Sequence, residues 1–246
     1  MIKISNSRAF LPNSFTALNA LCGFLSIISA SHNDFYMAAL FIFGGALFDI
    51  FDGLIARILG STSRLGVELD SLSDVISFGV APSFLIYQSY LNEFGAIGVV
   101  ISSFPMLFGA FRLARFNIQI EDITTKLDFK GLPIPISAIL LASLVLFYHN
   151  GVKIISPFSY MIIPLILILS FLMVSKIRYN AFPNLKKLNT FTKILLIAGA
   201  IIALALLVIT NGVAFFYILL AMVFGGILRH IFYLLFDLKK TALSKN

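Results

Sequence analysis

The sequence predicts an all-α, polytopic membrane protein, and three observations support this fold class. Hydrophobic residues make up 59% of the 246-residue chain and charged residues only 12%, with a mean hydropathy of +1.00. Apolar windows long enough to cross about 30 Å of hydrocarbon recur along nearly the whole chain. Lys and Arg fall near the start of one window and near the end of the next, so nearly all of them can lie on one side of the membrane, as in membrane proteins. Soluble globular domains do not combine these properties.

Eight apolar windows are predicted to span the membrane within a single domain, residues 1–246. The chain has neither a long polar linker nor a repeat with matching motifs in its two halves, which argues against an inverted-repeat transporter. In chain order the predicted spans are Phe15–Ser31, Phe35–Leu59, Leu69–Tyr90, Phe94–Leu113, Leu132–His149, Ile154–Val174, Phe191–Ile209 and Gly212–Leu235.

The distribution of Lys and Arg predicts that both termini lie in the cytoplasm. With eight spans and the N-terminus inside, 17 of the 18 Lys and Arg residues lie in inner loops or at inner span ends, and only Lys153 lies outside. The net charge of +7 is therefore explained by membrane topology, with anionic lipid headgroups as secondary partners. Nucleic acid is not an expected partner, because the cations are spread over every inner loop. We expect the cytoplasmic membrane as the location.

Acidic residues are concentrated in the hairpin between the second and third spans. Because a carboxylate at membrane depth is costly, it is kept mainly where it has partners and a function. On helices, positions 49, 52, 53, 56 and 57 share one face, as do positions 66, 70 and 74. A short loop at Gly60–Arg64 lets these two faces meet. Five of the eleven acidic residues lie within this segment: Asp49, Asp52, Glu68, Asp70 and Asp74.

The four aspartates of this hairpin are predicted to hold metal ions. Converging carboxylates in a medium of low dielectric constant repel one another unless cations lie between them. Hard oxygen ligands suit Mg²⁺ or Mn²⁺, and a pair of divalent cations is a common arrangement for phosphoryl chemistry. We therefore expect two divalent cations near the cytoplasmic surface, held by Asp49, Asp52, Asp70 and Asp74.

Small residues beside the aspartates leave room for a nucleotide or a diphosphate. Gly53 and Ala56 allow a ligand to approach the backbone closely, and Arg57 offers a guanidinium that binds phosphate in a bidentate manner. For Gly53 or Ala56 taken alone, helix packing is the simpler interpretation. The combination with four aspartates and an arginine in one register favours a binding site.

Residues 49–74 read D-x2-D-G-x2-A-R-x8-G-x3-D-x3-D, which resembles the signature of the CDP-alcohol phosphatidyltransferases at every fixed position. The resemblance implies that Asp49, Asp52 and Asp70 bind the metal pair. It implies that Asp74 both contacts metal and acts as the general base. The residues it places around the CDP-lipid are Gly53, Ala56, Arg57, Gly66 and a loop hydroxyl, for which we select Ser63.

Four further stretches resemble the integral-membrane phosphatidylserine synthase branch of this family. They are Leu11–Thr16 with Asn19 and Gly23, Glu68–Gly79, Arg112–Asn117 and Gly131–Pro135. This resemblance implies CDP-diacylglycerol as the donor, L-serine as the acceptor, and phosphatidylserine and CMP as the products. It implies that Asn13 and Thr16 help to hold the cytidine nucleotide, and that two copies of the chain form a homodimer.

The serine acceptor would require its own contacts beside the metals. Serine carries a carboxylate, and the loop expected between spans four and five supplies cations for it. Asp74 would remove the proton from the serine hydroxyl as its oxygen attacks phosphorus. For each cation the positive-inside pattern is an equally good explanation. The candidate serine-binding residues are Arg112, Arg115, Asn117 and Lys130.

Two other functions are compatible with parts of the sequence. A sister enzyme that uses the same donor with glycerol 3-phosphate or inositol phosphate shares the aspartate motif, and the stretches similar to serine synthases favour serine over these acceptors. An ion-coupled transporter also places aspartates in the membrane. Transport predicts acids along the membrane depth, whereas here they are confined to one hairpin, which favours chemistry.

Overall fold

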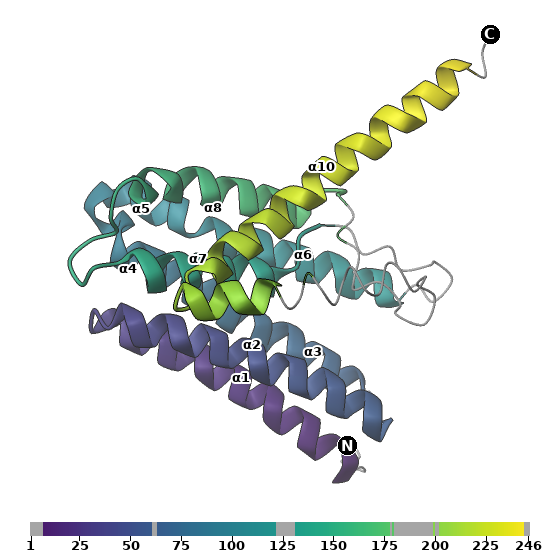
Figure 1. Ribbon diagram of the computed structural model, residues 1–246. Coiled ribbons are helices and arrows are strands. Elements are labelled where there is room, and N and C mark those ends of the chain that lie inside the picture. Colours follow the sequence, from purple (N-terminus) through teal and green to yellow (C-terminus); the bar gives the residue numbers. More distant parts are fainter. Residues whose placement is uncertain are drawn as a thin grey trace. The chain divides into compact units, whose positions relative to one another are not determined.

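A computed structural model of the chain describes residues 7–60, 63–121, 131–177, 179, 199 and 202–243 (Figure 1). Within these residues the regular structure is helical and contains no strand, which confirms the all-α class. Internal contacts divide the chain into two compact units. Unit 1 comprises residues 1–126 and 133–174, and unit 2 comprises residues 127–132 and 175–246.

Unit 1 contains all the helices that carry the predicted site. Unit 2 contributes a helical stretch at 202–209 and the 30-residue helix α10 (Ala214–Leu243). The helical elements of unit 1 are α1 (Ser7–Ser31), α2 (Phe35–Leu59), α3 (Arg64–Asp74), the π-helix η1 (Val75–Val80), α4 (Ala81–Ser89), the 3₁₀ helix η2 (Leu91–Phe94), α5 (Gly95–Ser102), α6 (Phe104–Glu121), α7 (Ile134–Tyr148) and α8 (Phe158–Val174).

Five helical stretches of the described chain are long and apolar enough to cross a membrane. They are Phe10–Ser31, Phe35–Leu59, Arg64–Ser89, Leu91–Ile118 and Ala214–Tyr233, and they correspond to the first four predicted spans and the last. The fifth and sixth predicted spans match the shorter apolar helices α7 and α8. Most of the seventh, Phe191–Ile209, lies outside the described residues. The membrane class is thus confirmed, and the count of eight stays a prediction.

The turn between α2 and α3 is defined at both of its ends. Gly60 has a positive φ of 58°, and its N–H bonds the carbonyl oxygens of Ala56 and Arg57, so α2 ends there. Ser63 caps α3 by accepting a hydrogen bond at Oγ from the Gly66 N–H, 3.0 Å away. The predicted reversal at Gly60–Arg64 is therefore confirmed, and it brings the acidic faces of the two helices together.

Helices α1, α2 and η1 cross closely next to Asp74. A Cβ atom added to Gly23 of α1 would lie 2.6 Å from Oγ and 2.7 Å from Cα of Ser77. On α2, a Cβ atom added to Gly45 would lie 3.0 Å from Oδ1 of Asn19. Because neither glycine carries a side chain, the backbone of α1 can pack closely against the backbones of α2 and η1. The π-helix begins directly after Asp74, and such segments are frequent at functional sites.

Helix α6 is longer than the sequence pattern indicated. The predicted fourth span ended at Leu113, with the following cations in a loop, whereas α6 continues to Glu121. The helical run is instead interrupted at Ser103, between α5 and α6. Pro105 occupies the first turn of α6, where a backbone N–H would have no partner within the helix, so the missing N–H of proline costs nothing. Arg, Leu and Ala are good helix formers and extend the helix. Arg112, which the predicted fourth span already included, lies on this helix. Arg115 and Asn117 lie on it as well, and their placement in a loop was wrong.

We expect Gly23→Ala to destabilise the protein by about 1–3 kcal/mol, the usual range for overpacking. The added methyl group would overlap the backbone of Ser77, which cannot move aside as a flexible side chain can. Thermal unfolding of detergent-solubilised protein measures the effect. Gly44→Ala is the matched control, since its Cβ would meet only Sγ of Cys22 at an ordinary 3.5 Å. Equal unfolding temperatures for the two variants would contradict the close crossing.

Candidate active site

Three aspartates from two helices form a compact group in unit 1. Asp49 comes from α2, and Asp70 and Asp74 come from α3. One carboxylate oxygen of each lies within 4.8 Å of the other two. Among the described residues, this is the group of His, Cys, Asp and Glu side chains arranged closely enough to hold a metal ion. The spacing of one helical turn between Asp70 and Asp74 places both on the face of α3 that meets α2.

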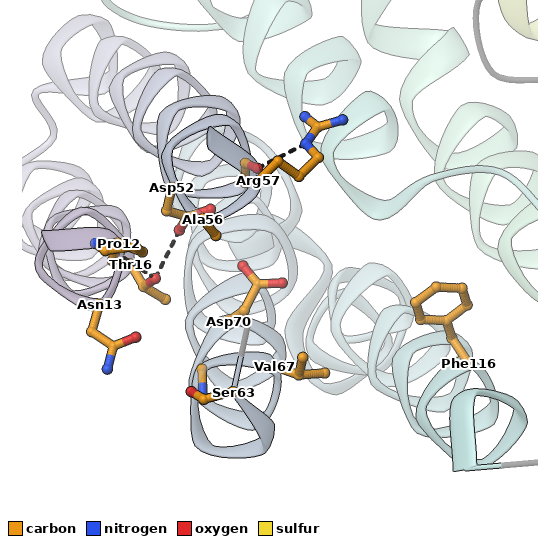
Figure 2. Close-up of a pocket in the computed structure, with 12 residues that line it drawn as sticks. Pro12, Asn13, Thr16, Asp52, Ala56, Arg57, Ser63, Val67, Asp70 and Phe116 are labelled. Carbon is orange, nitrogen blue, oxygen red and sulfur yellow. Dashed lines mark hydrogen bonds between the residues drawn. The ribbon is translucent and has the colours of Figure 1, made fainter. Parts of the chain in front are cut away.

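Asp52 is held separately from this group. It lies one turn after Asp49 on α2, is only 6% exposed, and accepts a hydrogen bond at Oδ2 from Oγ1 of Thr16, 2.8 Å away. Figure 2 shows this bond between α1 and α2, with Asp70 on the adjacent α3. The structure therefore groups three of the four predicted aspartates tightly and places the fourth beside them on a pocket wall.

The aspartate group has the chemistry of a divalent-cation site. Its ligands are all carboxylate oxygens, which Mg²⁺ and Mn²⁺ prefer. Oδ1 of Asp70 is buried and has no hydrogen-bond partner among the described residues. A buried acceptor left unpaired in this way costs free energy, and a cation bound to it would remove that cost. The residues present thus fit a metal ion.

A cavity of about 500 Å³ adjoins the aspartates. All seven residues that the sequence associated with the CDP-lipid line this cavity, together with Asp52 and Asp70. It is bounded by α1, α2, α3 and α6 (Figure 2). The lining residues are Pro12, Asn13, Thr16, Asp52, Gly53, Ala56, Arg57, Ser63, Gly66, Val67, Asp70 and Phe116.

The glycines of this pocket create its free space. A Cβ atom added to Gly53 would meet nothing within 4 Å, so the cavity extends up to the α2 backbone. At Gly66 a Cβ would lie 3.2 Å from Oγ of Ser63 and 3.4 Å from Oδ1 of Asn13, so the glycine lets these two polar groups come close. Arg57 folds along α2, where its Nε donates to the Gly53 carbonyl at 2.8 Å (Figure 2).

The structure divides the predicted serine-binding residues among different contacts. Arg112 is near enough to Asp74 to interact with it electrostatically, and its buried Nε has no hydrogen-bond partner among the described residues. Arg115 donates from Nη1 to the carbonyl of Val174 at the end of α8, at 2.9 Å. Nδ2 of Asn117 donates to Oγ of Ser71, the neighbour of Asp70, at 3.0 Å. Lys130 lies outside the described residues.

Two side chains near the site were not singled out as site residues from the sequence. Phe116 lines the cavity from α6, on the far side of α3 from α1 (Figure 2). Asn19 is fully buried in α1, and its Nδ2 donates to Oδ1 of Asp74 at 3.3 Å. The signal for Asn19 was present, because an amide three residues after Thr16 falls on the same face of an otherwise apolar helix. Phe116 carried no such signal among 26 phenylalanines.

Comparison with known proteins shows the family of the chain. The profile of the CDP-alcohol phosphatidyltransferases matches residues 9–172, the range that holds the aspartates and the cavity. The chain belongs to this family. It is 38% identical over 192 residues to the CDP-diacylglycerol--serine O-phosphatidyltransferase of Helicobacter pylori, covering 78% of this chain and 79% of the relative.

Two further relatives carry the same name. The Bacillus subtilis protein is 38% identical over 178 residues, which cover 72% of this chain and 92% of the relative. The Methanocaldococcus jannaschii protein is 35% identical over 219 residues, which cover 88% of this chain and 92% of the relative. The similarity therefore extends well beyond the aspartate motif.

We expect Asp70→Asn to have opposite effects with and without metal. Without divalent cations the variant should unfold at the same or a higher temperature, because one of three mutually repelling carboxylates is removed. With Mn²⁺ at about 100 times its dissociation constant, the wild type should gain about 2.7 kcal/mol, and the variant should lose most of this gain. Thermal unfolding in EDTA and in Mn²⁺ measures both effects.

Glu68→Gln is the control for that experiment, since Glu68 is an exposed acid on the same helix outside the aspartate group. It should retain the full Mn²⁺-dependent stabilisation. The metal assignment would be wrong if Asp70→Asn and Glu68→Gln responded to Mn²⁺ alike.

Proposed function

We propose that the protein transfers the phosphatidyl group of CDP-diacylglycerol to the hydroxyl of L-serine and releases phosphatidylserine and CMP. Family membership supports a transferase of this class, and the relatives named as serine O-phosphatidyltransferases support serine as the acceptor. The observation that carries the proposal is the continuity between the aspartate group and the cavity. Asp70 belongs to both, so a ligand in the cavity can reach the carboxylates.

Two divalent cations, Mg²⁺ or Mn²⁺, are proposed at Asp49, Asp52, Asp70 and Asp74. When bound, they neutralise the diphosphate of the donor and stabilise the departing CMP. Asp49, Asp70 and Asp74 supply the compact part of this ligand set. Asp52 supplies a carboxylate whose orientation is fixed by its bond to Thr16.

The CDP moiety is proposed to lie in the cavity along α1, α2 and the start of α3. Oγ of Ser63 accepts its capping bond from Gly66, so the hydroxyl proton remains able to donate to a phosphate oxygen. Arg57 uses Nε on its own helix and presents its terminal nitrogens to phosphate. Because Thr16 donates its proton to Asp52, it would meet the nucleotide as an acceptor. Asn13, Gly53, Ala56 and Gly66 complete the proposed contacts.

Asp74 is proposed as the general base. Its side chain is only 7% exposed, at the junction of α3 and η1. It would take the proton of the serine hydroxyl while the serine oxygen forms a bond to the phosphorus that carries diacylglycerol, and the bond from that phosphorus to the CMP oxygen would break. In this single displacement the proton would go to Asp74, the serine oxygen would bond to phosphorus, and CMP would leave.

Arg112 is the proposed partner of the serine carboxylate. Its buried Nε has no hydrogen-bond partner among the described residues, and the side chain lies within electrostatic range of the proposed base. A carboxylate bound there would place the serine hydroxyl near Asp74. Arg115 and Asn117 belong to the same proposed site chiefly by fixing α6 against α8 and α3. Lys130, predicted for the same site, lies outside the described residues.

The proposed membrane arrangement has eight spans, both termini in the cytoplasm and one functional domain in the cytoplasmic membrane. The distribution of Lys and Arg supports it, because nearly all of them fall at one end of the predicted spans. The cavity would then open to the cytoplasm, where CMP leaves and serine enters. A homodimer and contacts with membrane lipids are part of the same proposal.

A sister activity with a phosphorylated acceptor is the nearest alternative. The unpartnered Nε of Arg112 would receive a phosphate as readily as a carboxylate. Against it, Arg115 donates from Nη1 to the carbonyl of Val174, which draws its guanidinium toward the end of α8. An ion-coupled transporter is disfavoured by the match to a family of transferases.

Purified protein with Mn²⁺ or Mg²⁺ should release CMP from CDP-diacylglycerol when L-serine is added, and not with glycerol 3-phosphate or inositol phosphate. Asp74→Asn should reduce this rate by about 10²–10⁴-fold, the usual contribution of a general base. Chromatographic detection of CMP and of phosphatidylserine measures both. Turnover with another acceptor alone would retain the donor site and reject serine. Ion flux in proteoliposomes without CMP release would reject the enzyme.

Arg112→Gln should raise the KM for serine by about 10–100-fold, which corresponds to losing one charged hydrogen bond, and should leave the KM for CDP-diacylglycerol unchanged. Arg115→Gln is the matched control, because Arg115 donates from Nη1 to the carbonyl of Val174 at the end of α8. It should lower the unfolding temperature and should raise the KM for serine much less than Arg112→Gln does. If the two variants raised this KM equally, Arg112 would have no special place in the acceptor site.

A further inference from the structure

Asn19 places a polar amide at a fully buried position, where an amide is costly unless it is hydrogen-bonded. It lies in the middle of α1 and is 0% exposed. Its Oδ1 is buried and has no hydrogen-bond partner among the described residues. An orphaned buried acceptor is destabilising, and a leucine of similar size would fill the space without that cost. The function of Asn19 must therefore depend on its other end, Nδ2.

Nδ2 of Asn19 donates to Oδ1 of Asp74 at 3.3 Å. The main-chain carbonyl of Asn19 accepts from Oγ of Ser77 at 2.7 Å, so α1 is tied to the turn of η1 that follows Asp74. On the opposite side, Gly45 of α2 approaches Oδ1 closely. The reverse orientation of the amide would bring its oxygen against the Asp74 carboxylate, and two acceptors repel. The bond to Asp74 thus sets the orientation of the Asn19 amide, and the bond from Ser77 fixes the backbone that carries it.

Thr16 makes the corresponding contact one turn earlier on α1, where it donates to Asp52. The two donors differ in one respect. Thr16 lines the cavity, whereas Asn19 is fully buried and so cannot touch a ligand in it. Any effect of Asn19 on the reaction must therefore pass through Asp74.

We propose that Asn19 is a positioning residue that fixes the rotation of the Asp74 carboxylate within the aspartate group. By binding Oδ1, it leaves Oδ2 of Asp74 in a defined direction for metal binding and for accepting the serine proton. Outer hydrogen bonds of this kind orient metal ligands in many proteins. The inference rests on the proposed function for the role of Asp74. It assigns Asn19 to the catalytic carboxylate, whereas Asn13 and Thr16 of the same helix line the cavity proposed for the donor lipid.

Asn19→Leu tests this inference in the full-length, detergent-purified protein. Isothermal titration with Mn²⁺ alone should show about tenfold weaker binding, the lower end of the range for lost outer-shell contacts. In the CMP release assay kcat should fall while the KM for CDP-diacylglycerol stays unchanged, because Asn19 does not border the cavity. Asn19→Ser, whose side chain is too short to reach Asp74, should behave in the same way and provides a smaller substitution if the leucine disturbs folding.

Ser77→Ala is the matched control. It removes the bond to the Asn19 carbonyl and keeps the bond from Nδ2 to Asp74. It should lower the unfolding temperature in EDTA and leave Mn²⁺ affinity as in the wild type. Wild-type Mn²⁺ affinity in both Asn19 variants would overturn the inference. Equal losses of affinity in the Ser77 and Asn19 variants would do so as well, since they would indicate a packing role only.

The same measurements separate this inference from the proposed function. If the wild type bound Mn²⁺ but released CMP with an acceptor other than serine, the proposed function would fail. The ratio of Mn²⁺ affinities between the wild type and the Asn19 variants would still decide the role of Asn19. Conversely, serine-dependent turnover with unchanged Mn²⁺ affinity in these variants would support the function and reject the positioning role.

Discussion

Mutual repulsion among the clustered aspartates is the constraint on which the rest of unit 1 depends. Three carboxylate oxygens lie within 4.8 Å of one another at the depth of apolar helices, where charges interact far more strongly than in water. Helices α2 and α3 cannot approach in this way unless other groups offset the repulsion. Thr16 and Asn19 supply hydrogen-bond donors from α1, and Arg112 supplies a positive charge from α6. The orphaned oxygen of Asp70 marks where protein groups alone do not suffice.

The close approach of α1 follows from this constraint and from small residues. A donor reaches a carboxylate only if the two backbones lie near each other, and Gly23 and Gly45 provide that distance at the crossings with η1 and α2. The glycines of the cavity have a different role. No described atom would meet a Cβ added to Gly53, so this position keeps space for a ligand rather than for a neighbouring helix. Glycine thus permits close helix packing at positions 23 and 45 and leaves space for a ligand at position 53.

Much of the site could be predicted from the sequence because its residues are close along the chain. Helical periodicity places Asp49 and Asp52 on one face and Asp70 and Asp74 on another, and the short turn at Gly60 requires the faces to meet. What escaped prediction depends on contacts between distant segments. Asn19 meets Asp74 across 55 positions, and Arg115 meets Val174 across 59. Local pattern does not specify such pairings. The end of α6 at Glu121 was also missed, because the polar residues after Leu113 form a pattern that is typical of a loop after a membrane span.

The division of labour among the helices has a consequence for acceptor choice. In the proposed mechanism the donor contacts and the metal ligands lie on α1, α2 and α3, whereas the group that selects the acceptor, Arg112, lies on α6. Arg112 meets the metal ligands at Asp74, the base that any alcohol acceptor would need. Substitutions on α6 that keep the charge of Arg112 can therefore change the acceptor without disturbing the balance of charge among the aspartates. Changes at Thr16 and Asn19 of α1 cannot, because these two donors are bound to carboxylates. The aspartate motif accordingly identifies the donor chemistry, and the acceptor must be inferred from α6.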